Sequence, residues 1–161
     1  AASGRPAAAT AGVLAGGAAI WVEVSFWLLS FCVFLFLSLA LVKRSGELIA
    51  ARDKNERTVE GRAYRLSDLD TLRPLGIATS VAAMLVFALY IRTPESQSGY
   101  GTPSWLWMTM TALTVWLGHT WLLTGRGQME DDPLVYATRD HVSQLLIALM
   151  VVGFALAALI H

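Results

Sequence analysis

The residues of this chain that could carry chemistry gather first in a basic stretch, residues 43–73. Eight of the twelve Lys and Arg residues of the chain lie there, mixed with carboxylates. Lys and Arg neutralise phosphate oxygens, and carboxylates hold the Mg²⁺ that bridges such oxygens. We therefore predict a site for a phosphate or a lipid headgroup, with Asp68 and Asp70 as candidate Mg²⁺ ligands. The candidate contacts to the phosphate are Lys43, Arg44, Glu47 and Arg65.

A structural role explains the same residues. Basic side chains at the end of a membrane helix contact anionic lipid headgroups, and each contact contributes about 1 kcal/mol. The segment 66–72 looks like a helix start, with Ser67 as N-cap and Asp70 at the position where a carboxylate reaches back. Residue types and spacing favour this structural role over the phosphate site.

A second polar stretch, residues 126–141, contains three consecutive acids at positions 130–132. Such a group could bind a divalent cation. However, these acids precede Pro133 and the last apolar segment, where negative charge stabilises a helix N-terminus. Arg126 and Arg139 are also close enough in sequence to neutralise them. A structural role is again favoured.

His119 is an isolated candidate, because it lies inside an apolar segment. An ionisable side chain within a membrane is a functional candidate that faces a cavity or a partner helix. It could be a ligand for haem or chlorophyll in an apolar pocket. The favoured alternative is a neutral imidazole hydrogen-bonded to a neighbouring Ser or Thr. Glu23 similarly lies at an interface or is paired, and the single cysteine, Cys32, is expected to be a small core residue.

These residues are positioned by an unusually apolar chain, which is 55% hydrophobic with a mean hydropathy of +0.54. Crossing a bilayer takes roughly 20 apolar residues, and fewer where the bilayer thins. Residues 7–22, rich in Ala and Gly, are expected to form a shorter, partial span. We predict an all-α integral membrane bundle of four to five transmembrane helices in one domain, residues 1–161. The full spans are expected at 25–42, 74–91, 104–124 and 142–160.

Charge asymmetry predicts the orientation of this bundle. The excess of Lys and Arg places residues 43–73 in a cytoplasmic loop. Alternation then puts residues 92–103 outside and residues 125–141 in the cytoplasm. Within the loop, the preceding helix is expected to continue to Lys54 and to break at Gly61, and Pro74 is expected to begin the next span. Four aromatic residues near span ends are expected at the membrane interface: Tyr90, Trp105, Trp107 and Trp121.

Three parts of the chain resemble the UbiA family of intramembrane prenyltransferases: residues 24–48, residues 61–76 and residues 121–143. The most specific part contains Arg126-Gly127, Asp131-Asp132-Pro133 and Arg139-Asp140. Within the family, the chain is similar to the bacterial branch related to decaprenyl-phosphate phosphoribosyltransferase. Members of that branch join a polyprenyl phosphate to phosphoribosyl diphosphate. The resemblance implies a bacterial cytoplasmic membrane protein whose helices correspond to the C-terminal portion of the UbiA fold.

The resemblance also implies two polar motifs, and the first is absent here. In the family, an Asn-Asp-x-x-Asp-x-x-x-Asp run holds Mg²⁺ and diphosphate, whereas the one asparagine of this chain is Asn55, followed by Glu56. The stretch 43–73 stands where the second motif lies. Relatives also carry Lys-Arg-Tyr-x-Glu-Leu at residues 43–48 and tend to have Arg at the position of His119.

Two functions are compatible with this pattern. The favoured one is a non-catalytic or degenerate UbiA-like accessory subunit that packs against other membrane subunits in a larger complex. The alternative is the C-terminal half of a Mg²⁺-dependent prenyltransferase that acts on a polyprenyl phosphate and is completed by N-terminal helices. Whether the chain is part of an enzyme is therefore open. Its zero formal net charge gives no indication of a nucleic-acid partner.

Overall fold

The computed structural model describes residues 25–53, 65–129 and 132–160, and these residues form an all-α structure. Two short 3₁₀ turns, Leu66–Asp68 and Pro103–Trp105, precede the second and fourth helices of this part of the chain. Within the described ranges there are six α-helices: α2 (Phe26–Asp53), α3 (Leu69–Ile91), α4 (Pro94–Gly99), α5 (Leu106–Gly125), α6 (Pro133–Ala137) and α7 (His141–Leu159).

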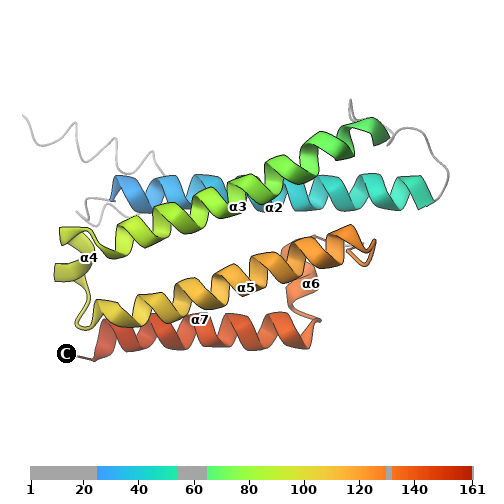
Figure 1. Ribbon diagram of the computed structural model, residues 1–161. Coiled ribbons are helices and arrows are strands. Elements are labelled where there is room, and N and C mark those ends of the chain that lie inside the picture. The colour runs from blue at the N-terminus through green and yellow to red at the C-terminus, as the bar shows by residue number, and fades with distance from the viewer. Residues whose placement is uncertain (1–24, 54–64, 130–131, 161) are drawn as a thin grey trace, which may run out of the picture.

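The four long helices form two antiparallel pairs (Figure 1). Helix α2 packs on α3, α5 packs on α7, and the two pairs meet mainly through α3 and α5. The short helix α4 connects the pairs at one end of the bundle, and α6 lies beside the other end. Helices of 19 to 28 residues in this arrangement have the length that a membrane bundle requires.

Three of the described helical segments are long and apolar enough to cross a membrane: α2, α7 and Leu66–Ile91, which comprises α3 with its preceding turn. Helix α5 has the length, but its threonines and His119 make it more polar. The prediction of an all-α chain with several apolar helices is therefore confirmed, whereas a membrane crossing by 104–124 stays a prediction. The partial span 7–22 and Glu23 lie outside the described residues.

The start of α3 differs from the prediction. The backbone N–H of Arg65 donates to Asp68 Oδ2 at 2.8 Å, so the cap sits at Arg65 and not at Ser67. Helix α3 begins at Leu69 and runs through Pro74. Pro74 is the sixth residue of α3, so it lies inside the helix and removes one backbone hydrogen bond, to the carbonyl of Asp70. Leu69 and Leu72 precede the predicted span and pack against α2, and this burial extends the helix toward its N-terminus. The predicted break at Gly61 lies outside the described residues.

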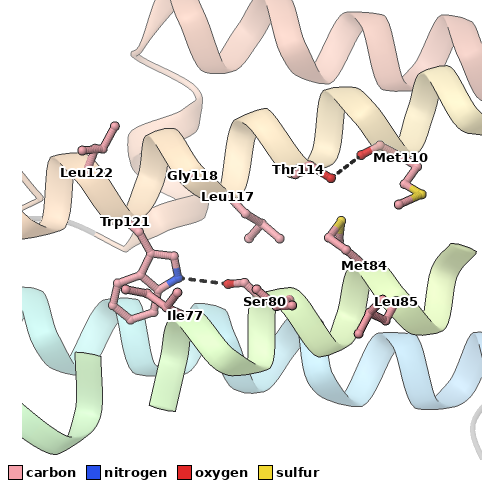
Figure 2. Close-up of a pocket in the computed structure, with 11 residues that line it drawn as sticks. Ile77, Ser80, Met84, Leu85, Met110, Thr114, Leu117, Gly118, Trp121 and Leu122 are labelled. Atoms are coloured by element: carbon pink, nitrogen blue, oxygen red, sulfur yellow. Dashed lines mark hydrogen bonds between the residues drawn. The ribbon is translucent and has the colours of Figure 1, made fainter. Parts of the chain in front are cut away.

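A buried group of polar atoms holds three helices together, and Figure 2 shows the hydrogen bond between Trp121 and Ser80 that belongs to it. The indole N–H of Trp121 on α5 donates to Ser38 Oγ on α2 at 3.2 Å and to Ser80 Oγ on α3 at 3.1 Å. The two hydroxyls are 2.6 Å apart, and each lies within hydrogen-bond reach of the Gly76 carbonyl. A Cβ at Gly76 would overlap the indole ring. We call these four residues the Trp121 node.

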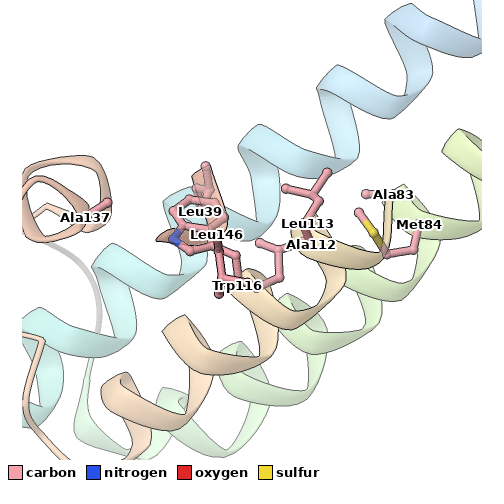
Figure 3. Packing of buried hydrophobic residues seen from close by; sticks show 9 residues of the cluster. Leu39, Ala83, Met84, Ala112, Leu113, Trp116, Ala137 and Leu146 are labelled. Atoms are coloured by element: carbon pink, nitrogen blue, oxygen red, sulfur yellow. The ribbon is translucent and has the colours of Figure 1, made fainter. Parts of the chain in front are cut away.

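The Trp121 node corrects one prediction about aromatic residues. Trp121 and Tyr90 are buried between helices, with 9% and 7% of their surface exposed, so their rings pack inside the bundle and do not face lipid headgroups. Trp105 and Trp107 are more exposed, as expected for residues at the bundle edge. Next to the node, Trp116 packs in an apolar cluster with Leu39, Met84 and Leu146, so that α2, α3, α5 and α7 share one core (Figure 3).

Replacing Gly76 with Ala should destabilise the bundle by about 1–3 kcal/mol, because the new methyl group must displace the indole ring of Trp121. The matched control is Gly118→Ala on α5, where a Cβ meets no atom within 4 Å. This control should be neutral or stabilising, because alanine favours the helix. Unfolding of both variants in detergent micelles measures the difference. Equal stability of the two variants would contradict the packing described for Gly76.

Candidate functional site

Most charged groups of the described chain lie at one end of the bundle, formed by the end of α2, the start of α3, the end of α5, helix α6 and the start of α7 (Figure 1). We call this the polar end. Among the described acidic and basic residues, only Arg92 and Glu95 lie at the opposite end, beside α4. The predicted phosphate candidates and His119 therefore belong to one region of the fold.

Lys43 and Asp132 connect α2 to α6. Lys43 Nζ lies 3.0 Å from Asp132 Oδ2, and the side chains are 47% and 38% exposed. The Lys43 hydrogen bond, together with the Leu134 backbone N–H, lowers the pKa of Asp132. An exposed pair of this kind contributes roughly 0–1 kcal/mol. The sequence had suggested Arg126 and Arg139 as partners for the acids at 130–132. Lys43 is a partner of Asp132 that the sequence did not suggest. Positions 130 and 131 lie outside the described residues.

Arg44 and Glu47 form an ion pair along α2, with Arg44 Nη1 3.0 Å from Glu47 Oε2. The two residues between them, Ser45 and Gly46, are buried. A Cβ at Gly46 would come within 2.8 Å of the Met129 carbonyl oxygen. The resemblance led us to expect a tyrosine at position 45. The small residues Ser45 and Gly46 instead allow the segment after α5 to approach α2.

Arg65, Asp68 and Asp70 lie around the start of α3. Asp68 accepts hydrogen bonds from the Arg65 backbone and, at 3.4 Å, from the Ser67 hydroxyl. Asp70 is exposed on the first helical turn. Among the described residues, no group of three His, Cys, Asp or Glu side chains is placed to hold a metal ion. A Mg²⁺ site at Asp68 and Asp70 therefore stays a prediction, and within this part of the chain its ligand set would be incomplete.

Arg73 was not singled out by the sequence as a site residue. Its Nη2 donates to the Gly125 carbonyl at 3.1 Å and so connects the start of α3 to the end of α5. The last carbonyls of a helix have no partner within the helix, and a cation there is stabilising. The basic stretch contained the signal for Arg73, but only the tertiary packing identifies α5 as its partner.

His119 has a carboxylate partner, which corrects the predicted Ser or Thr partner. His119 Nε2 lies 3.0 Å from Asp140 Oδ2, and the side chains are 25% and 17% exposed. Asp140 is also the N-cap of α7 and accepts from the Ser143 backbone N–H at 2.8 Å. Burial raises the pKa of Asp140, but the hydrogen bonds from Ser143 and His119 together outweigh it and leave the pKa below its usual value. Ligation of a pigment by His119 stays a prediction.

Two cavities adjoin these groups. A polar one of about 440 Å³ lies at the start of α7, where Tyr136, Arg139 and Asp140 contribute to its walls. The second, an apolar groove of about 550 Å³, lies between α3 and α5, and Ser80 and Trp121 of the Trp121 node line part of it (Figure 2). A cationic end next to apolar walls can bind an amphipathic anion, with the charge at the polar end and the hydrocarbon between helices.

Comparison with known proteins gives two relatives, both bacterial. The chain is 35% identical over 132 residues to the uncharacterized protein y4nM of Sinorhizobium fredii, a match that covers 81% of this chain and 26% of that protein. It is 28% identical over 145 residues to the nodulation protein NoeC of Azorhizobium caulinodans, covering 89% of this chain and 47% of that protein. The chain thus spans about a quarter and about half of these relatives. No family model matches the chain. No solved structure matches it either.

Replacing Asp140 with Asn should reduce stability in a pH-dependent way. The pKa of Asp140 is depressed below 3.8 in the folded state, so its charge contributes stability above that value. The contribution is lost as the pH falls through the folded-state pKa. The stability difference between the wild type and Asp140→Asn should therefore shrink between about pH 5 and pH 2.

Unfolding in micelles at several pH values measures this difference. The control is Asp70→Asn, the same chemical change at an exposed carboxylate. A difference for Asp140→Asn that stays constant down to pH 2 would contradict the proposed hydrogen bonding of Asp140.

Proposed function

We propose that this chain forms one half of an intramembrane site for a polyprenyl phosphate, of the kind found in UbiA-type prenyltransferases. Further helices, in the same polypeptide or in a partner, supply the other half. In this proposal the residues of the polar end bind and orient the lipid phosphate. The lipid phosphate oxygen would form the new bond to a co-substrate such as phosphoribosyl diphosphate, which loses its diphosphate. Mg²⁺ bound by the completed site would neutralise charge on that leaving diphosphate.

The observation that carries this proposal is the location of four cationic side chains on two neighbouring helices at the polar end. Lys43 and Arg44 on α2 and Arg65 and Arg73 near the start of α3 belong to neighbouring helices that share a buried core. Membrane helices lie directly above these residues. A phosphate held here has its lipid chain within reach of the hydrocarbon region, which is the geometry that transfer to a lipid phosphate requires.

The length of the relatives supports the half-site over an accessory subunit. The chain aligns to about half of NoeC and about a quarter of y4nM, so related sequences occur within longer proteins. The incomplete metal-ligand set of the described residues supports the same proposal, because a first Asp-rich motif would have to come from elsewhere. This reverses the order in which residue patterns alone rank the two functions.

An accessory subunit without catalysis is the second candidate. It is supported by the ion pairs of the polar end, since Lys43, Arg44 and Glu47 already have partners within the chain. Apolar surface on α2 and α7, including Phe36 and Leu145, could then contact other membrane subunits. Co-purification with a large membrane complex, together with no binding of a polyprenyl phosphate, would favour this candidate.

We also propose that the chain resides in a bacterial cytoplasmic membrane with its polar end in the cytoplasm. In a Cys32→Ala background, a cysteine introduced at Ser98 on α4 should react with a membrane-impermeant maleimide on intact cells. A cysteine at Gln128, which is exposed at the polar end, should react only after the membrane is opened. The reverse labelling pattern would contradict the orientation.

Binding of a polyprenyl phosphate to the chain in neutral-lipid nanodiscs tests the proposed function. The double variant Lys43→Gln/Arg65→Gln should weaken binding about thirtyfold, since each cation near the membrane surface contributes about 1 kcal/mol. Arg92→Gln, at the opposite end of α3, is the matched control and should bind normally.

A turnover assay with Mg²⁺, a polyprenyl phosphate and phosphoribosyl diphosphate separates the two candidates further. The chain alone should bind lipid phosphate without turnover, and turnover should appear when a membrane segment that carries the Asp-rich motif is co-expressed with it. Absence of binding by the chain would contradict the half-site. Turnover by the chain alone that is abolished by Asp70→Asn would mean that no second half is needed.

A further inference from the structure

The groove between α3 and α5 is open to the side of the bundle. Its rim residues are largely exposed, with Ile77, Val81 and Leu85 on α3 and Leu122 on α5 each at least half accessible. Figure 2 shows Met84 and Leu117 inside the groove, pointing toward one another from the facing helices. A side-opening apolar groove in a membrane helix bundle is filled from the bilayer. Its volume of about 550 Å³ is within the range of ligand pockets.

Gly118 makes room for an occupant. It lies on the face of α5 that lines the groove, and a Cβ built there meets no atom within 4 Å. Glycine at this position is therefore not required by packing between helices, in contrast to Gly76. Along α5 the lining extends from Met110 to Leu122, which at 1.5 Å per residue is about 18 Å. The groove is long enough for much of one extended hydrocarbon chain.

Two guanidinium groups belong to the end of this groove. Arg73 precedes Ile77 by four residues on α3, and Arg126, the C-cap residue of α5, follows Leu122 by four residues and keeps helical backbone angles. Residues four apart lie on the same face of a helix, so both arginines continue the groove walls toward the polar end. The hydrogen bond from Arg73 to the Gly125 carbonyl brings the two helix ends together. Neither arginine forms an ion pair with an acidic residue in the described ranges.

We propose that this groove is a binding site for an anionic phospholipid, with one acyl chain between α3 and α5 and the headgroup phosphate on Arg73 and Arg126. The apolar walls bind the chain, and the paired guanidinium groups select a negative headgroup, because arginine matches phosphate geometry. Bilayer phospholipid is the abundant source of such a molecule, and the site needs no substrate to be present. Arg73 is common to this site and to the proposed polyprenyl phosphate site, so competition between the two lipids decides which one occupies the groove.

The test measures phosphatidylglycerol and phosphatidylcholine bound to the purified chain by native mass spectrometry from mixed micelles. The wild type should retain one phosphatidylglycerol in preference to phosphatidylcholine. Gly118→Leu fills the groove and should lower retention of both lipids at least tenfold. Arg73→Gln/Arg126→Gln should lower the preference for phosphatidylglycerol about thirtyfold and leave phosphatidylcholine binding unchanged. Arg73→Lys, which keeps the charge, should retain most of the preference.

Matched controls separate the site from general lipid association. Ala148→Leu adds bulk on an exposed face of α7, and Arg92→Gln removes a charge at the opposite end; neither should change retention. Melting temperatures in detergent identify variants that fail to fold, and the single variant Arg126→Gln, which keeps the Arg73 hydrogen bond, then replaces the double variant. Equal retention by Gly118→Leu and the wild type would overturn the proposal. Displacement of phosphatidylglycerol by tenfold less polyprenyl phosphate would also overturn it, since the groove would then belong to a lipid-linked substrate.

Discussion

The structure depends on one interaction, the hydrogen bonding of the Trp121 indole N–H on α5 to hydroxyl groups of two other helices. A buried donor without a partner costs about 1–3 kcal/mol. The hydroxyls of Ser38 and Ser80 satisfy it, and they can approach because Gly76 leaves space for the ring. The Trp121 side chain thereby fixes the position of α5 along the bundle axis relative to α2 and α3.

The arrangement of the polar end follows from this alignment of α5 with α2 and α3. Lys43 lies little more than one helical turn beyond Ser38, and Arg73 and Gly125 lie about one turn from Gly76 and Trp121. Once the Trp121 node aligns the three helices, Lys43, Arg73 and the Gly125 carbonyl lie at a similar depth in the bundle. The cationic end, the groove above the node and the proposed headgroup contacts are consequences of the same alignment.

Hydropathy and charge were sufficient to predict the apolar helices and to group Lys43, Arg44 and Arg65, because both signals are local. Which groups pair was not predictable. Asp140 lies 21 residues from His119, and Asp132 lies 89 residues from Lys43, so only tertiary packing brings them together. The buried position of Trp121 was missed for a related reason. Its place near a span end indicated the interface, whereas its acceptors are on two other helices.

The most direct test of this account is a double-mutant cycle between Trp121→Phe and Ser80→Ala, measured as free energies of unfolding in micelles. Trp121→Phe keeps an aromatic ring and removes the N–H donor. The account predicts a coupling energy of about 1 kcal/mol, within the range for residues that share a hydrogen-bond network. The exposed Trp107, replaced by Phe in the same helix, should show no coupling to Ser80→Ala. Additive effects of Trp121→Phe and Ser80→Ala, within about 0.3 kcal/mol, would contradict the central role of the Trp121 node.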